Sequence, residues 1–270
     1  QRIRWIKGEQ IGKGSFGRVF HAINTDTGDV IAVKQVPIPT RPSKRLAQEQ
    51  GKMVESLYAE IILLKDLEHD HIVQYIGFEA GDEHVNLFME YVAGGTLSSL
   101  LGKHGAFSLP VIRSFTRQVA SGIAYLHDRS ILHRDIKGAN ILINEEGVCK
   151  ISDFGISKKS EYAMAYGHQA HLSMQGSTFW MAPEVVRRAG YSAKVDIWSL
   201  GCVILEMAAG QRPWMSLNEV ASMYRLGQGL APPIPDRITS VEVREALSHC
   251  FAKEPDDRPT AHEILELPLC

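Results

Sequence analysis

The chain has 270 residues, a length that suits one large domain or two lobes sharing a cleft. Its composition, 44% hydrophobic and 22% charged, excludes a disordered, collagenous or coiled-coil chain. The 29 basic and 31 acidic residues give a net charge of −2, so we expect no nucleic-acid partner. The four isolated cysteines and the lack of an apolar run of ~18 residues predict a cytoplasmic protein with no membrane partner. Since the chain begins at Gln1, we expect an excised domain whose flanking regulatory regions are absent.

The first part of the chain is predicted to form β-strands and one helix. Alternating apolar and polar residues between turn signals predict three strands, a loop at 37–50 rich in Pro, Lys and Gln, and two further strands. The helix lies between the loop and the last two strands, with apolar residues at helical spacing. The expected strands are 5–10, 17–24, 29–36, 73–78 and 85–91, and the apolar face of the helix carries Met53, Leu57, Ile61 and Leu64.

After two consecutive glycines at 94–95, the pattern becomes mainly helical. Residues 108–127 carry one apolar stripe, which predicts an amphipathic helix with a serine as its N-cap. Residues 195–209 are apolar nearly all round and predict a central helix that ends at Gly210. The predicted class is therefore α+β, with a β-rich lobe that contains one main helix and a second, mainly α-helical lobe.

A glycine-rich motif, G-x-G-x-x-G, occupies residues 12–17. Dinucleotide-binding folds use the same spacing, but they place a helix after the glycines and an acidic residue about 20 positions later. Here alternating residues after the motif predict a strand and then a hairpin, which favours a loop laid over phosphates between two antiparallel strands. A glycine-rich surface hairpin is the alternative that this motif alone leaves open.

Lys34 and Glu60 are two charges predicted to lie at apolar positions. Lys34 shares a strand face with Ala32, and Glu60 lies at or near the apolar stripe of its helix. Because an unpaired buried charge is costly, the two side chains are expected to pair and to leave the ammonium able to reach a phosphate. Two surface side chains that keep their charged ends in water are the alternative.

Residues 133–140, H-R-D-I-K-G-A-N, carry the strongest chemical signal, and Asp153 begins a D-F-G motif downstream. Phosphoryl transfer requires a positioned nucleophile, a metal that neutralises phosphate charge and cationic contacts to the moving group. Asp135 can accept or orient a hydroxyl proton, and Lys137 can hold the γ-phosphate. Asn140 and Asp153 supply the hard oxygen ligands that Mg²⁺ prefers.

With A-P-E at 182–184 and D-I-W-S-L-G at 196–201, the chain resembles a eukaryotic protein kinase domain over essentially its whole length. The resemblance implies a bilobal kinase fold that binds ATP and Mg²⁺. It also implies an ion pair between Glu184 and Arg258.

The same resemblance divides the chain into an N-lobe at about 1–89, a hinge at about 90–95 and a C-lobe at about 96–270. The implied catalytic residues are Asp135, Lys137, Lys34 and Glu60. The residues implied to bind ATP are Ile11, Gly12, Lys13, Gly14, Ser15, Phe16, Gly17, Arg18, Val19, Ala32, Lys34, Met89, Glu90, Val92 and Leu142.

Lys137 after Asp135, together with G-S-T-F-W-M at 176–181, resembles the serine/threonine branch of the kinases. Residues 138–142, 152–159 and 179–184 resemble MAP kinase kinase kinases, and residues 191–201 and 231–235 resemble the fungal cell-wall-integrity type in particular. That resemblance implies a MAP kinase kinase as the protein substrate. An upstream kinase of the related sterile-20-like group is the alternative, because it shares much of the signature.

The segment between D-F-G and A-P-E contains three candidate phosphorylation sites, Ser173, Ser177 and Thr178. A phosphate on this segment is expected to pair with Arg134 and to order the loop. Kinases of this group are also expected to form a transient dimer for trans-phosphorylation. A dead kinase fold acting as a scaffold is disfavoured because every catalytic motif is present, and a small-molecule kinase is disfavoured because the A-P-E segment serves peptide docking.

Overall fold

A computed structural model describes residues 3–14, 17–37, 61–62, 64–81, 83–154, 158–159, 178–190 and 192–270. The chain divides into two compact units. One comprises Gln1–Ala93 and Asp153–Ile156, and the other comprises Gly94–Ser152 and Ser157–Cys270. Within the described ranges, no helix is both long and apolar enough to cross a membrane.

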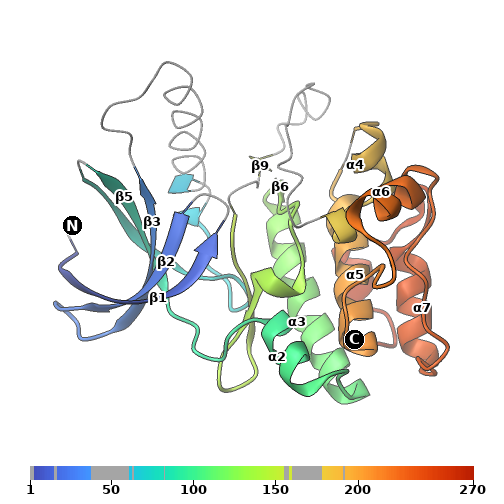
Figure 1. The fold of residues 1–270 in the computed structure, drawn as a ribbon, viewed down its shortest axis with the longest axis horizontal. Helices are drawn as coiled ribbons and strands as arrows, with labels where there is room; N and C mark the ends of the chain where they lie inside the picture. Colours follow the sequence, from blue (N-terminus) through green and yellow to red (C-terminus); the bar gives the residue numbers. More distant parts are fainter. Residues whose placement is uncertain are drawn as a thin grey trace. The chain divides into compact units, whose positions relative to one another are not determined.

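The first unit is built on a five-stranded antiparallel sheet with the strand order β1-β2-β3-β5-β4 (Figure 1). The strands are β1 (Trp5–Gly14), β2 (Gly17–Asn24), β3 (Val30–Pro37), β4 (Tyr75–Ala80) and β5 (His84–Glu90). One face of the sheet buries Ala22, Ile31, Val33 and Phe88 completely or nearly so. Trp5 covers this cluster, with its ring edge-on to Phe88 at a centroid distance of 5.8 Å.

All five predicted strands are confirmed, although β1 continues to Gly14 instead of ending at Gln10, and the other strand ends differ by up to two residues. β4 begins at Tyr75 rather than Val73, because Ile72 and Val73 are both buried and therefore do not alternate as a strand with one exposed face would. Of the predicted helix between the strands, Ile61 and Leu64 are described and buried, as expected, whereas Met53 and Leu57 lie outside the described residues.

The second unit is mainly helical. Its helices are α2 (Leu97–His104), α3 (Leu109–Asp128), α4 (Pro183–Arg187), α5 (Lys194–Ala209), α6 (Glu219–Gly227), α7 (Val241–Cys250) and α8 (Ala261–Leu265). Its short strands are β6 (Ile131–Leu132), β7 (Ile141–Ile143), β8 (Cys149–Ile151) and β9 (Lys158–Lys159), and its 3₁₀ turns are η1 (Gly138–Asn140), η2 (Thr178–Trp180) and η3 (Pro255–Asp257). The predicted α+β class is confirmed.

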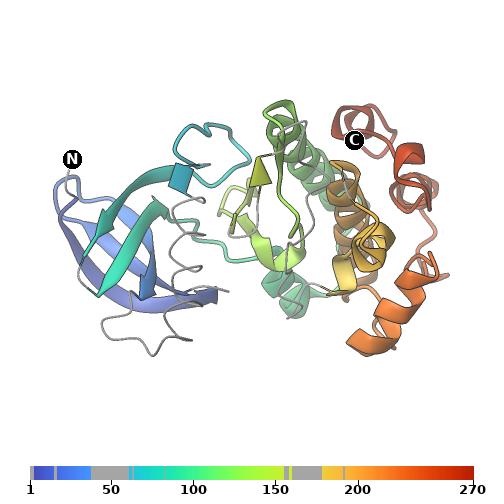
Figure 2. The same ribbon diagram turned by 90° about the horizontal axis from the view of Figure 1, so that it is seen from above.

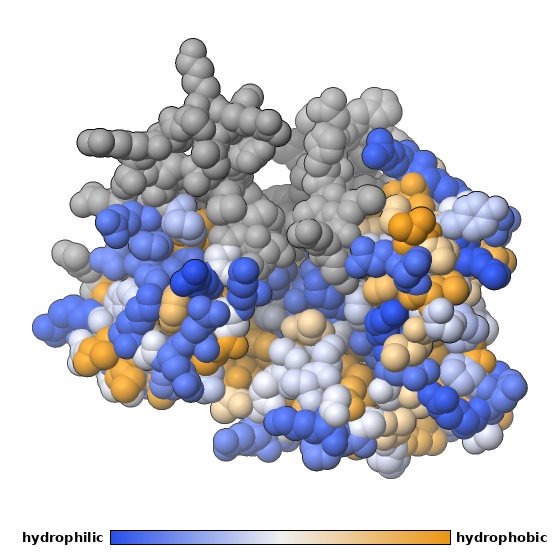
Figure 3. Space-filling model, viewed as in Figure 1, coloured by the Kyte–Doolittle hydropathy of each residue, from blue (hydrophilic) through white to orange (hydrophobic). Residues whose placement is uncertain are grey.

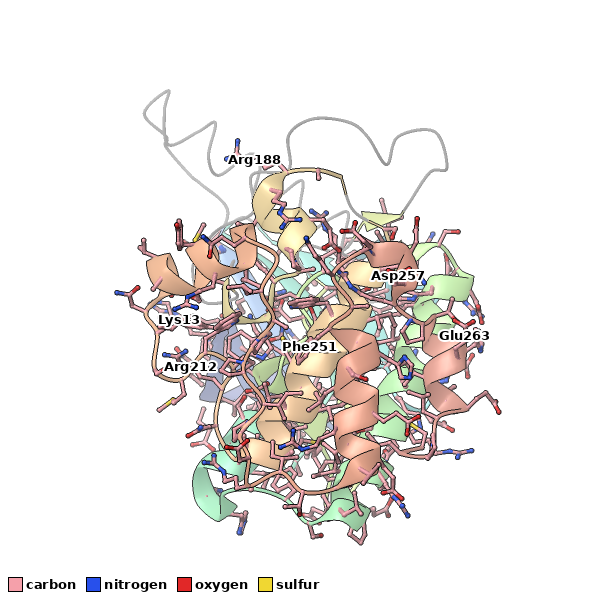
Figure 4. The ribbon with its side chains drawn as sticks, turned by 90° about the vertical axis from the view of Figure 1, so that its right-hand side faces the viewer. Lys13, Arg188, Arg212, Phe251, Asp257 and Glu263 are labelled. Atoms are coloured by element: carbon pink, nitrogen blue, oxygen red, sulfur yellow. The ribbon has the colours of Figure 1, made fainter. Side chains whose placement is uncertain are left out.

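Helix α5 lies between α3 and α7 in both ribbon views (Figures 1 and 2). Nearly all of its residues are buried, which fits a segment that is apolar all round. It ends at Gly210, whose φ of 67° is the left-handed conformation that favours glycine, as the sequence predicts. Trp198 of α5 packs against Phe251, labelled in Figure 4, at a ring distance of 5.0 Å. Together these contacts make α5 the core of the unit.

The visible surface of the second unit mixes hydrophilic and hydrophobic residues (Figure 3). Apolar side chains are exposed at α6 and in the turn before it, at Met215, Val220 and Tyr224. The predicted helix over 108–127 is also confirmed, since α3 follows Ser108 directly, although the serine side chain makes no capping hydrogen bond.

Candidate active site

The glycine-rich motif forms the hairpin between β1 and β2. Gly12 pairs with Val19, and Gly14 pairs with Gly17, so the two strands run antiparallel on either side of the turn. At Gly17 an added Cβ would lie 2.2 Å from the carbonyl oxygen of Gln35, which leaves no room for a side chain. The predicted arrangement of two strands is therefore confirmed, and the strand-to-helix turn of a dinucleotide-binding fold is excluded.

The structure describes most of the residues implied to bind ATP. Ile11, Gly12, Lys13 and Gly14 lie on β1, Gly17, Arg18 and Val19 on β2, Ala32 and Lys34 on β3, Met89 and Glu90 on β5, Val92 just after β5, and Leu142 on β7. Ala32 and Met89 are cross-strand neighbours. The backbone N–H of Glu90 donates to the carbonyl of Gln74 at 3.0 Å, and Glu90 Oε1 accepts from the Gln74 N–H at 2.7 Å, which fixes the end of β5.

Lys34 is buried on β3, with 3% of its surface exposed, as its position on an inward face predicts. Its ammonium forms an ion pair with Asp153 Oδ1 at 3.1 Å. Asp153 adopts a φ of 63°, an uncommon conformation for a residue other than glycine. Glu60, the partner that the sequence predicts for Lys34, lies outside the described residues.

Asp135 is held by two residues of its own loop. Its Oδ2 accepts from Lys137 Nζ at 2.6 Å and from Asn140 Nδ2 at 2.9 Å, and Asn140 also donates to the Asp135 carbonyl at 2.9 Å. Asp135 and Asn140 are buried, at 8% and 7% exposed. The structure thus brings the predicted base, the predicted phosphate-binding lysine and one predicted metal ligand into one hydrogen-bonded group.

Asp196 anchors this loop to α5. Its carboxylate accepts from the backbone N–H of His133 at 3.0 Å and of Arg134 at 2.8 Å, and it contacts His127 Nε2 at 2.9 Å. Burial opposes ionisation of Asp196, but the hydrogen bonds and positive charge around it hold its pKa below the usual 3.8. Arg134 takes a left-handed φ of 70°, so these bonds also stabilise an uncommon backbone conformation.

Glu206 is a further buried carboxylate, which the sequence analysis did not single out. Its Oε2 accepts from the backbone N–H of Gly138 at 3.2 Å and from the indole Nε1 of Trp180 at 2.7 Å. Burial raises its pKa from 4.5 to about 7, and the two hydrogen bonds partly oppose that rise. The available sequence signal was its position as one of only two acidic residues, with Asp196, in the apolar segment 195–209.

The ion pair implied between Glu184 and Arg258 is confirmed. Arg258 Nη1 and Nη2 bind the two carboxylate oxygens of Glu184 at 2.6 and 2.9 Å, a bidentate arrangement. Both residues are buried, at 6% and 1% exposed. The pair therefore fixes the A-P-E segment to the loop that precedes α8.

Thr178, a candidate phosphorylation site, lies in η2 with only 1% of its surface exposed. A modifying enzyme could reach its hydroxyl only after this turn opens. Besides Glu60, the predicted site residues that lie outside the described part of the chain are Ser15, Phe16, Ser173 and Ser177.

Asn140 and Asp153 each carry an oxygen donor of the kind that hard divalent cations bind. Because the Asn140 amide nitrogen is engaged with Asp135, the amide oxygen is the atom that suits a metal, and Asp153 offers a carboxylate. This is the donor chemistry that Mg²⁺ prefers. The two residues belong to different units, and each is described within its own unit.

A glycine-rich strand hairpin, a buried lysine and the H-R-D loop anchored on α5 are the features that define the class of protein. Residues 5–270 match the family model for the protein kinase domain, and the chain belongs to that family. It is 50% identical over 273 residues to the MAP kinase kinase kinase mkh1 of Schizosaccharomyces pombe, covering 99% of this chain and 24% of the relative.

Two further relatives place the resemblance in the same group. The serine/threonine-protein kinase BCK1/SLK1/SSP31 of Saccharomyces cerevisiae is 50% identical over 274 residues, covering 100% of this chain and 18% of the relative. Mitogen-activated protein kinase kinase kinase 2 of Arabidopsis thaliana is 45% identical, covering 99% of this chain and 41% of the relative. The chain thus spans less than half the length of these relatives. The predicted resemblance to MAP kinase kinase kinases is confirmed.

Proposed function

We propose that this domain transfers the γ-phosphate of Mg-ATP to serine or threonine hydroxyls of a protein substrate, and that the substrate is a MAP kinase kinase. The observation that carries the proposal is the group formed by Asp135, Lys137 and Asn140 in a loop fixed to α5 by Asp196. A catalytic carboxylate must be held in position before the substrate arrives, and this group meets that requirement.

Each residue of the loop has a role in the proposed reaction. The substrate hydroxyl attacks the γ-phosphorus, its proton passes to Asp135, and the bond from the γ-phosphorus to the departing ADP oxygen breaks. Lys137, beside the carboxylate at 2.6 Å, contacts the γ-phosphate. When Mg²⁺ is bound, it neutralises charge on the phosphate oxygens, and Asn140 and Asp153 are the residues that would hold it.

In the sheet, the backbone of the glycine hairpin at 12–17 would cover the phosphates, and Lys34 would contact them. Burial of the Lys34 side chain supports this role, because a buried ammonium strengthens its attraction to phosphate. The adenine would lie between apolar side chains that include Val19, Ala32 and Leu142. The backbone of Glu90 and Val92 would bind its polar edge, with Met89 before them and Glu60 as an additional partner for Lys34.

The proposed lobes follow the same assignment, with an N-lobe at about 1–89, a hinge at about 90–95 and a C-lobe at about 96–270. The four cysteines, Cys149, Cys202, Cys250 and Cys270, are all free thiols, which supports a cytoplasmic location. Phosphorylation at Ser173, Ser177 or Thr178, in a transient dimer of two copies, is the proposed route of activation.

The names of the relatives support the choice of substrate, because mkh1 and the Arabidopsis relative are named as MAP kinase kinase kinases. The test is transfer of labelled phosphate from Mg-ATP to a MAP kinase kinase that has been inactivated by mutation, with Asp135→Asn as control. Phosphoserine or phosphothreonine on the substrate is expected only with the parent domain. Transfer to a generic basic protein but not to the MAP kinase kinase would keep the kinase activity and reject this substrate.

A further inference from the structure

Arg212 lies in the turn that connects α5 to α6, and its guanidinium holds that turn together. Nη1 donates to the carbonyls of Pro213 and Trp214 at 3.0 and 2.9 Å, and Nη2 donates to the carbonyl of Leu217 at 3.1 Å. Trp214 takes a left-handed φ of 55°, which is uncommon for a bulky residue. Three hydrogen bonds from one side chain, labelled in Figure 4, therefore fix a strained turn shortly before α6 begins at Glu219.

The same guanidinium also contacts the segment that leads to A-P-E. Its central carbon lies over the ring of Phe179, 3.7 Å from the ring centroid. Phe179 belongs to η2, is 9% exposed, and its ring meets that of Trp180 edge-on at 6.1 Å. A cation over an aromatic ring is attracted to it more strongly where water is excluded, and this ring is buried. Since η2 also packs against α6, Arg212 joins the turn before α6 to the residues that precede A-P-E.

No carboxylate neutralises Arg212 within the ranges that the structure describes. Arg113 and Arg258 each form an ion pair with a glutamate, whereas Arg212 contacts carbonyl oxygens and an aromatic ring. A guanidinium has five N–H groups in a rigid plane, so it can bind three carbonyls and still present its face to a ring. A lysine ammonium would supply the same charge but not this geometry. The arrangement therefore depends on the planar shape of the side chain and not on charge alone.

We propose that Arg212 is a positioning residue that sets the affinity for the protein substrate, and the proposal rests on the kinase function proposed above. By holding Phe179 against the turn before α6, it keeps the segment before A-P-E in one conformation, ready to bind a peptide. A segment without this contact would have to be ordered during binding, and the entropy lost would lower affinity. Loss of the contact should therefore raise the KM for the protein substrate.

The other kinetic constants distinguish this role from a merely structural one. The KM for ATP and kcat should not change, because Arg212 belongs neither to the proposed nucleotide site nor to the H-R-D loop. A variant that only unfolds in part would instead show a lower apparent kcat at an unchanged KM for the protein, because fewer active molecules would be present.

The experiment measures kcat and the KM values for ATP and for the inactivated MAP kinase kinase in the parent, Arg212→Met, Phe179→Leu, their double variant and Arg129→Met. Arg129→Met is the matched control, because Arg129 also lies 3.7 Å from a ring centroid, that of Tyr125, and also donates to a carbonyl, but outside the proposed sites. Arg212→Met and Phe179→Leu are each expected to raise the KM for the protein about tenfold. In both variants kcat and the KM for ATP should stay within about twofold of the parent, as should all three constants of Arg129→Met.

The double variant should have no higher a KM for the protein than the more impaired single variant, because the same contact can be lost only once. Arg212→Lys should remain closer to Arg212→Met than to the parent, because it keeps the charge but loses the planar fork. A KM equal to that of the parent in Arg212→Lys would show that charge alone suffices and would overturn the inference.

The inference is also wrong if Arg212→Met raises the KM for the protein no more than Arg129→Met, or if the two single effects multiply in the double variant. Phe179→Leu leaves the three hydrogen bonds of Arg212 in place, so an unchanged KM in that variant refutes the inference even if Arg212→Met does not fold. A parent domain that fails to phosphorylate any protein would instead refute the proposed function itself.

Discussion

Replacing Glu206 with glutamine should make the stability of the chain less dependent on pH. Burial raises the pKa of the carboxyl from 4.5 in the unfolded chain to about 7 in the fold. Below pH 4.5 the group is protonated in both states, so no charge is buried. As the pH rises from 4.5 to 7, the unfolded chain releases this proton first, and the free energy of unfolding falls. At about 1.4 kcal/mol for each pKa unit, the whole loss is about 3 kcal/mol.

The assay is urea unfolding of the parent and of Glu206→Gln at about pH 5 and about pH 8. Because the two proteins differ only at residue 206, contributions from every other ionisable group cancel in the comparison. The pKa of Asp196 is lowered below 3.8, so this group stays ionised over the same range. Between about pH 5 and about pH 8, the free energy of unfolding of the parent should fall by about 2–3 kcal/mol more than that of the variant.

The control for this assay is Glu219→Gln, which makes the same charge change at an exposed position on α6. The control should keep the pH dependence of the parent. If Glu206→Gln also keeps it, the Glu206 carboxyl does not titrate in the fold near pH 7, and the argument from its burial is refuted.

Three further substitutions test other parts of the structure. Lys34→Met should lower kcat roughly 10²-fold or more by removing the charge that positions the phosphates, and a rate near that of the parent would reject its role. Glu184→Ala should lower the free energy of unfolding, measured in urea, by about 3–5 kcal/mol, because Arg258 would stay buried without its partner. A decrease of less than about 1 kcal/mol would contradict this. Gly201→Ala should lower the free energy of unfolding by about 1–3 kcal/mol, because the new Cβ would lie 2.6 Å from a cysteine side chain of α7. An unchanged midpoint of thermal unfolding would show that α5 and α7 can move apart to make room for it.

Local sequence determined the strands, the long helices and the order of the chemical groups. A strand or an amphipathic helix depends on the spacing of apolar residues within a short window, so β2 and α3 could be predicted nearly to their ends. The H-R-D loop is also a local feature, because Lys137 and Asn140 lie within five residues of Asp135 and can reach its carboxylate whatever the rest of the fold does.

Only the tertiary structure decided which distant groups support the loop. Asp196 reaches the backbone of His133 across 63 positions, and Glu206 joins Gly138 to Trp180 across 68 and 26 positions. Of these bonds, only the one to the Trp180 indole goes to a side chain that a pattern could mark. The others go to backbone N–H groups, which occur at nearly every residue, so the spacing of residues does not reveal which of them are bound. Their geometry depends on how α5 packs against its neighbours. Spacing along the chain reveals a contact only when both partners lie in one element, and here the fold itself brings them together.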